Sequence, residues 1–158
     1  MLDASQRLVF IERYRGGYQA VVDALAGTTD AELDADVAEG WSVREIVHHL
    51  ADSEMTSAIR LRRLLAEENP LIQGYPEAEF ARRLYYRQRP IAASLAAFQA
   101  ARESTATILD HMTEADWQRT GTHSESGPYS AETWLEIYAA HAHDHAAQIR
   151  RARKATKG

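Results

Sequence analysis

Residues 134–149 read WLEIYAAHAHDHAAQI, and this stretch sets both the helical period and the candidate chemistry of the chain. At about 100° per residue, one face of a helix here carries the large side chains and two of the histidines: Trp134, Tyr138, His141, His145 and Gln148. His141 and His145 lie only about 40° apart, whereas His143 points about 200° away from His141 and is expected to be exposed. Two imidazoles at positions i and i+4 of one helix can hold one metal ion.

A second stretch with histidines, residues 42–53, opens another helix. Ser42 to Glu45 reads SVRE, a capping box that fixes the start of the helix. His49 lies on the apolar face of this helix together with Ile46, whereas His48 is about 100° away from it. The middle of this face is small and polar, which leaves room beside His49.

The remaining periodicity is almost entirely helical. Four long helices are expected, at Ser5–Leu25, Ser42–Ala66 (or as far as Glu68), Pro90–His111 and Ser130–Lys154. Residues 29–32 form a capping box for a short helix, residues 113–117 a short turn and residues 121–129 a polar loop. Residues 71–89 are a long connection, which allows a crossover that makes the second and third long helices parallel. We therefore predict one domain over residues 1–158, an all-α four-helix bundle in up-down-down-up order.

This topology sets the second and fourth long helices antiparallel and can bring three imidazoles to one level. A single inward histidine is more often a hydrogen-bonded core residue than a ligand, but three of them in a small core would be costly without a shared purpose. We therefore predict a metal site made of His49, His141 and His145. Three histidines leave at least one coordination position open, as in catalytic zinc sites, and imidazole also suits nickel, iron and copper.

Composition excludes several classes of protein. The 158 residues are 45% hydrophobic and 26% charged, which is typical of a globular domain. A net charge of −5 argues against a general nucleic-acid binder. The absence of cysteine excludes disulfides, a cysteine-ligated metal and a cysteine nucleophile. No run approaches the roughly 18–20 apolar residues of a membrane span, and the start MLDASQ lacks the features of a signal peptide, so we expect a cytoplasmic protein without membrane contacts.

Other polar residues near the predicted site are weaker candidates. Gln148 follows His145 by three residues and could bond a ligand ring or a bound water, or be a buried amide of the core. Asp52 could orient His49 or pair with an arginine. His123 could approach the site from its loop, although a solvated histidine is the commoner outcome.

The histidine stretches resemble the DinB/YfiT-like family. The matching segments are residues 40–53, GWSVREIVHHLADS, and the HxxxHxxQI string of residues 141–149. The loop HSESG, residues 123–127, and Tyr138 are similar to the YfiT branch, and the likeness runs from about Thr29 to Arg151. Glu54 departs from that branch, which tends to carry a histidine there.

The resemblance implies an up-down-down-up bundle with a divalent metal on His49, His141 and His145, and often a homodimer. It also implies an activity. We expect a thiol S-transferase that joins a low-molecular-weight thiol of the bacillithiol type to a small electrophile, with zinc or nickel as the metal. The alternative is a metal-dependent hydrolase that uses metal-bound hydroxide. A third hypothesis is a non-catalytic, metal-stabilised module for stress response or interaction. General acid and base residues remain unassigned.

Overall fold

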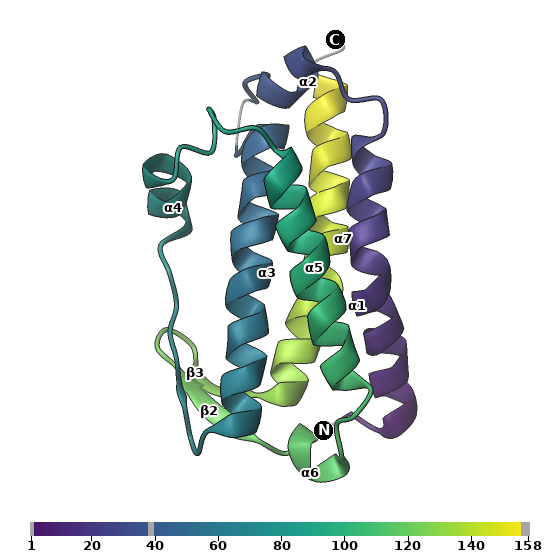
Figure 1. The fold of residues 1–158 in the computed structure, drawn as a ribbon, viewed down its shortest axis with the longest axis vertical. Coiled ribbons are helices and arrows are strands. Elements are labelled where there is room, and N and C mark those ends of the chain that lie inside the picture. The colour runs from purple at the N-terminus through teal and green to yellow at the C-terminus, as the bar shows by residue number, and fades with distance from the viewer. Residues whose placement is uncertain (1, 38–39, 156–158) are drawn as a thin grey trace.

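The computed structural model describes residues 2–37 and 40–155. Its long helices are α1 (Ala4–Leu25), α3 (Val43–Ala66), α5 (Ala92–Leu109) and α7 (Ala131–Ala155). Figure 1 shows α1 and α7 running in one direction and α3 and α5 in the other. The predicted four-helix bundle with up-down-down-up order is therefore confirmed. Among the described helices, none is long and apolar enough to cross a membrane.

Side-chain caps fix where the long helices begin. Asp3 caps α1 and Ser42 caps α3, each in a capping box with the residue three positions later. The Ser130 hydroxyl accepts a hydrogen bond from the Thr133 amide at 3.0 Å, which caps α7 as predicted. These caps satisfy amides that have no partner inside the helix, and they fix the helical phase of the histidines that follow.

The long crossover carries structure of its own. It contains the short strand β1 (Leu71–Ile72) and the helix α4 (Glu77–Arg83), and it passes along the outside of α3 before α5 begins (Figure 1). The predicted short helix is present as α2 (Asp30–Asp34), whereas the segment predicted as a turn forms the short helix α6 (Glu114–Trp117); each begins with a capping box.

The prediction of a polar loop over residues 121–129 is wrong, because this segment folds into a hairpin. β2 (Thr120–His123) pairs antiparallel with β3 (Gly127–Ser130), and β1 adds to β2 in parallel. Gly121 makes the pairing possible, since a Cβ there would lie 2.5 Å from the Pro70 carbonyl oxygen. Only glycine allows this close approach, which the loop-like composition of the segment did not reveal.

Two apolar clusters form the core, one toward each end of the bundle. The first is built around Trp134 and Leu61, and the second around Ile46 and Ile149. Between them on α3 lie the buried polar residues Ser53, Glu54 and Ser57. The bundle is therefore apolar at both ends and polar in the middle.

Candidate metal centre

Three histidines from two helices converge inside the bundle. His49 comes from α3, and His141 and His145 come from α7. Each offers one ring nitrogen, and these nitrogens all lie within 4.8 Å of one another. The Nε2 atoms of His49 and His141 are 3.3 Å apart. The antiparallel arrangement of α3 and α7 thus brings together the residues that the sequence predicted as metal ligands.

The spacing and protonation of these rings fit a divalent metal. Two nitrogens at about 2.0–2.1 Å from a tetrahedral ion are separated by about 3.3–3.4 Å, which matches the distance between Nε2 of His49 and Nε2 of His141. Burial, together with the charge of neighbouring histidines, lowers the pKa of His49 to about 3 and that of His141 to about 2. Burial also lowers the pKa of His145. All three rings are therefore neutral near pH 7, the form that binds metals.

Gln148 fixes the tautomer of one ligand. Its Oε1 atom lies 2.7 Å from Nδ1 of His145. Because an amide oxygen can only accept a hydrogen bond, Nδ1 of His145 carries the hydrogen and Nε2 keeps a free lone pair. The contact expected from the spacing between these two residues is present.

Hydrogen bonding gives no purely structural reason for the cluster. Nδ1 of His49 and Nδ1 of His141 are buried and have no hydrogen-bond partner among the described residues. Unpaired buried polar atoms cost free energy, so a core built only for packing would not favour three imidazoles here.

The surroundings of the cluster are aromatic. The Trp41 ring lies 4.7 Å from the His49 ring, and the Tyr138 ring lies edge-on at 5.8 Å from the His141 ring, as measured between centroids. Within the described part of the chain, no carboxylate forms a hydrogen bond or ion pair with any of the three histidines. Among the described residues, the three rings are thus free of direct contacts with a carboxylate.

The structure corrects two predictions about candidates close to the cluster. Asp52 neither orients His49 nor pairs with an arginine; it accepts a hydrogen bond from the Tyr86 hydroxyl. His143 was expected to be exposed but is half-buried, because its Nε2 lies 2.8 Å from the Arg13 carbonyl oxygen on α1.

The other histidines lie outside the cluster. His123 is a buried residue of β2 rather than a solvated loop residue, and its Nδ1 accepts a hydrogen bond from the Glu125 amide. His48 lies away from the ligand face as predicted, with Nδ1 at 2.7 Å from the Ser94 hydroxyl and Nε2 near the Arg89 carbonyl.

Sequence reasoning missed a buried ionic network next to the cluster. Arg102 on α5 pairs with Glu54 on α3 at 2.9 Å, and both side chains are almost fully buried. Glu54 also accepts from the Tyr14 hydroxyl, while Arg102 donates to the backbone carbonyls of Tyr14 and Tyr138. The only signal in the sequence was that Glu54 replaces a histidine of the YfiT branch.

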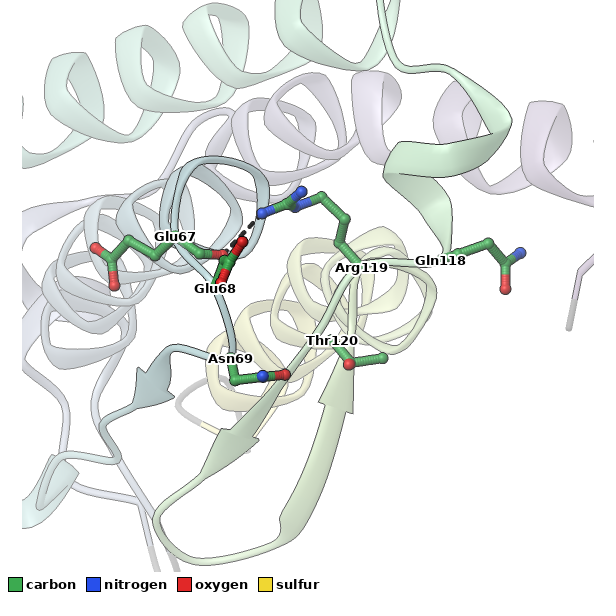
Figure 2. A pocket seen from close by; sticks show the side chains of 6 residues that line it. All are labelled: Glu67, Glu68, Asn69, Gln118, Arg119 and Thr120. Carbon is green, nitrogen blue, oxygen red and sulfur yellow. Dashed lines mark hydrogen bonds between the residues drawn. The ribbon is translucent and has the colours of Figure 1, made fainter.

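A pocket at the other end of α3 holds no comparable chemistry. It lies between the end of α3 and the start of β2, as Figure 2 shows. Its single cationic side chain, Arg119, donates to the carbonyl oxygens of Leu64 and Glu67 and so caps the last turn of α3. These hydrogen bonds give Arg119 a structural role.

Fold and site together define a class: a four-helix bundle with an internal three-histidine cluster suited to a divalent metal. A profile of the DinB superfamily matches residues 13–149, and the chain belongs to this family.

Two bacterial relatives carry a common description. A protein of Oceanobacillus iheyensis is 42% identical over 110 residues, which cover 70% of this chain but only 63% of that protein. A protein of Geobacillus thermodenitrificans is 35% identical over 134 residues, covering 83% of this chain and 75% of its own. Both are named "Putative metal-dependent hydrolase".

One solved structure is similar over nearly the whole chain. It is described as "YfiT from Bacillus subtilis is a probable metal-dependent hydrolase with an unusual four-helix bundle topology". The TM-score is 0.92 at 28% identity, and the match covers 99% of this chain and 91% of that one. The arrangement of helices predicted from the sequence is therefore shared with this relative.

Proposed function

We propose that the chain is a metal-dependent enzyme in which His49, His141 and His145 hold one divalent ion, zinc or nickel. The observation that carries this proposal is the convergence of three imidazoles, each offering a ring nitrogen within 4.8 Å of the others, with Nε2 of His49 and Nε2 of His141 only 3.3 Å apart. Three protein ligands leave a coordination position open to a substrate. The names of the relatives support the same general class.

The protein's own residues hold and shield the reacting group. Gln148 orients His145, and the rings of Trp41 and Tyr138 exclude water from two sides. A bound divalent metal would supply a Lewis acid that lowers the pKa of a thiol or a water molecule.

Thiol S-transfer is the reaction that we propose. The chain has no cysteine, so a sulfur nucleophile has to come from a low-molecular-weight thiol. No described carboxylate bonds to the ligand histidines, and a thiol needs no strong base because its ordinary pKa is only about 8.5. The thiol would lose its proton to solvent, and its sulfur would then form a bond to carbon of a small electrophile as a leaving group such as halide departs with the electrons of the broken bond.

Hydrolysis is the second candidate, because the relatives are named as hydrolases. It would use water instead of a thiol at the open position.

A homodimer and a cytoplasmic location stay predictions.

One experiment separates these possibilities. Wild-type protein, His145→Ala and His143→Ala would each be loaded with zinc or nickel and analysed by elemental mass spectrometry. Each would then be incubated with a model aryl halide plus thiol, or with a model ester without thiol. About one metal per chain and metal-dependent thiol consumption in wild type and His143→Ala, both lost in His145→Ala, would support the transferase. Ester cleavage without thiol would support the hydrolase, and absence of metal would refute both.

A further inference from the structure

Three buried polar atoms near the histidine cluster lack hydrogen-bond partners. The hydroxyls of Tyr75 and Tyr129 and the Nε atom of Arg60 are buried and form no hydrogen bond among the described residues. Tyr129 is only 4% exposed as a whole residue. All three atoms can donate a hydrogen bond. Leaving three donors unpaired is costly in a folded core, so the group is expected to have a ligand.

The three unpaired donors lie close together around the Arg60 side chain. Arg60 donates to the Tyr138 hydroxyl at 2.9 Å and lies over the Tyr75 ring at 6.0 Å. Burial raises the pKa of Tyr129, and the positive charge of Arg60 opposes that rise. Burial likewise raises the pKa of Tyr75 to about 12, and the nearby Ser53 and, to a smaller extent, the charge of Arg60 oppose that rise. Both phenols therefore remain protonated donors near pH 7.

The fold holds these residues in position from three sides. Arg60 is on α3, Tyr129 is on β3, and Tyr75 follows β1 in the crossover. The Gly74 amide donates to the Ser124 hydroxyl at 2.9 Å, which fastens the crossover to the hairpin beside Tyr75. The small sheet, which the sequence did not predict, thus places Tyr75 and Tyr129 near Arg60.

Arg60 differs from its neighbours on α3 in its charge balance. No ion pair joins it to a carboxylate among the described residues, whereas Arg63 forms one with Glu67 at 2.8 Å. Glu77 is near enough for Arg60 to oppose the burial-driven rise of the Glu77 pKa, yet the two do not pair. Arg60 therefore offers a positive charge that forms no direct ion pair with a carboxylate among the described residues.

The group adjoins the metal centre. The Tyr138 hydroxyl accepts from Arg60, and the same side chain lies against His141 with 5.8 Å between ring centroids. One side chain therefore separates the arginine from the cluster.

We propose that Arg60, Tyr75 and Tyr129 bind a carboxylate of the substrate that reacts at the three-histidine centre. A guanidinium with two hydroxyl donors matches the charge and the lone pairs of a carboxylate. This inference rests on the proposed function and narrows its substrate class to small carboxylic acids.

The test follows the side-chain Nε–H signal of Arg60 by two-dimensional NMR in the wild-type protein. The signal is assigned by its absence from Arg60→Met. Hexanoate is the charged probe and hexanol the uncharged control, each titrated into metal-free and zinc-loaded protein. We expect hexanoate to shift the Arg60 signal saturably and hexanol to leave it in place. Equal shifts with both probes, or none with hexanoate, would overturn the carboxylate site.

Variants test the individual donors. Tyr129→Phe should weaken hexanoate binding at least roughly tenfold, because it removes one hydrogen bond to a charged group, and Arg60→Met should weaken it further. Arg63→Met removes the same charge from the same helix but leaves the donors in place, so its affinity should stay within about twofold of wild type. Unchanged binding in Arg60→Met would refute the proposal. Where Arg60→Met does not fold, the Arg60 signal is assigned by its absence from Arg60→Lys, and the wild-type titration still decides the matter.

Two further measurements distinguish failure of the proposed function from failure of the carboxylate site, and show which of the two substrates carries the carboxylate. If no metal binds, the proposed function fails, while the metal-free titration still decides the carboxylate site. With zinc bound, 6-mercaptohexanoate is compared with hexanoate. Tighter binding of the thiol acid would assign the carboxylate to the thiol cosubstrate. Equal affinity would assign it to the other substrate, and either result retains the site.

Discussion

A single hydrogen bond decides which nitrogen His145 presents to a metal. Gln148 accepts from Nδ1 at 2.7 Å, so Nε2 is left for coordination. We predict that Gln148→Ala lowers zinc affinity by about 10- to 100-fold, the usual cost of removing such a partner. Competition with a chromophoric chelator measures this affinity. His143→Ala, on the same helix but outside the cluster, should bind zinc as wild type does, and an unaltered affinity in Gln148→Ala would contradict the role given to this amide.

Two adjacent glycines of α1 have opposite roles. A Cβ on Gly17 would lie 2.6 Å from Nη1 of Arg102 and 2.8 Å from Cβ of Ala142, whereas Gly16 has only His143 Cε1 nearby, at 3.9 Å. Arg102 is buried and held by several partners, so it cannot move aside. Gly17→Ala should therefore destabilise the fold by about 1–3 kcal/mol.

Gly16→Ala is the matched control and should stabilise the fold by about 0.5–1 kcal/mol, the helix-propensity gain. Urea denaturation measures both changes in the free energy of unfolding. Equal effects at the two positions would show that packing against Arg102 does not matter. The two glycines are identical in the sequence, so only the fold shows that Gly17 faces the core.

Residue-level prediction worked where the helical period controls orientation. His141 and His145 share a face because they are four positions apart, and His49 faces them because the capping box at Ser42 fixes its phase. Prediction was wrong for Asp52 because its partner, Tyr86, lies 34 positions away in the crossover. Nothing in the sequence singled out Arg60, because the absence of a carboxylate partner and the nearness of Tyr75 and Tyr129 depend on the folded hairpin.

At the scale of elements, one buried ion pair connects the helices. Arg102 on α5 bonds to Glu54 on α3 and to backbone carbonyls of Tyr14 on α1 and Tyr138 on α7. Arg102→Met should lower the free energy of unfolding by about 3–5 kcal/mol, because Glu54 would remain buried and unpaired.

The double variant Arg102→Met/Glu54→Met should lose less stability than Arg102→Met alone, because no unpaired charge is left. Chemical denaturation of the two single variants and the double variant provides the cycle. Additive losses would mean that the pair is not coupled. The four helices were predictable from periodicity, but this cross-connection was not, since a charged residue on a helix normally faces solvent.

The small sheet shows what element-level patterns miss. Its strands are only two to four residues long, too short for a clear alternation, and β1 pairs with β2 from a distant part of the chain. Glycine, serine and proline in residues 121–129 indicated a loop. The pairing depends on the approach of Pro70 to Gly121, a tertiary contact.

For the whole molecule, the histidine cluster couples stability to pH. The metal-free fold keeps His49 and His141 neutral, with pKa values of about 3 and 2, whereas the unfolded chain has ordinary values near 6.5. Below about pH 6.5, and down to the folded-state pKa values, the unfolded state therefore binds more protons than the folded state. The two histidines cost no stability above about pH 6.5, and the free energy of unfolding decreases progressively as the pH falls below that value.

Each of these two histidines should cost the metal-free protein about 2 kcal/mol between pH 6.5 and pH 5. Thermal melts of chelator-treated protein at several pH values measure the loss, and His49→Gln is the comparison because it removes one titrating ring. Its melting temperature should fall less on acidification than that of wild type. Zinc should raise the melting temperature at pH 7, since it binds only the folded state, and should do so less at pH 5, where protons compete for the ligands. A melting temperature that does not change between pH 7 and pH 5 without metal would mean that the three rings are not held neutral in the core.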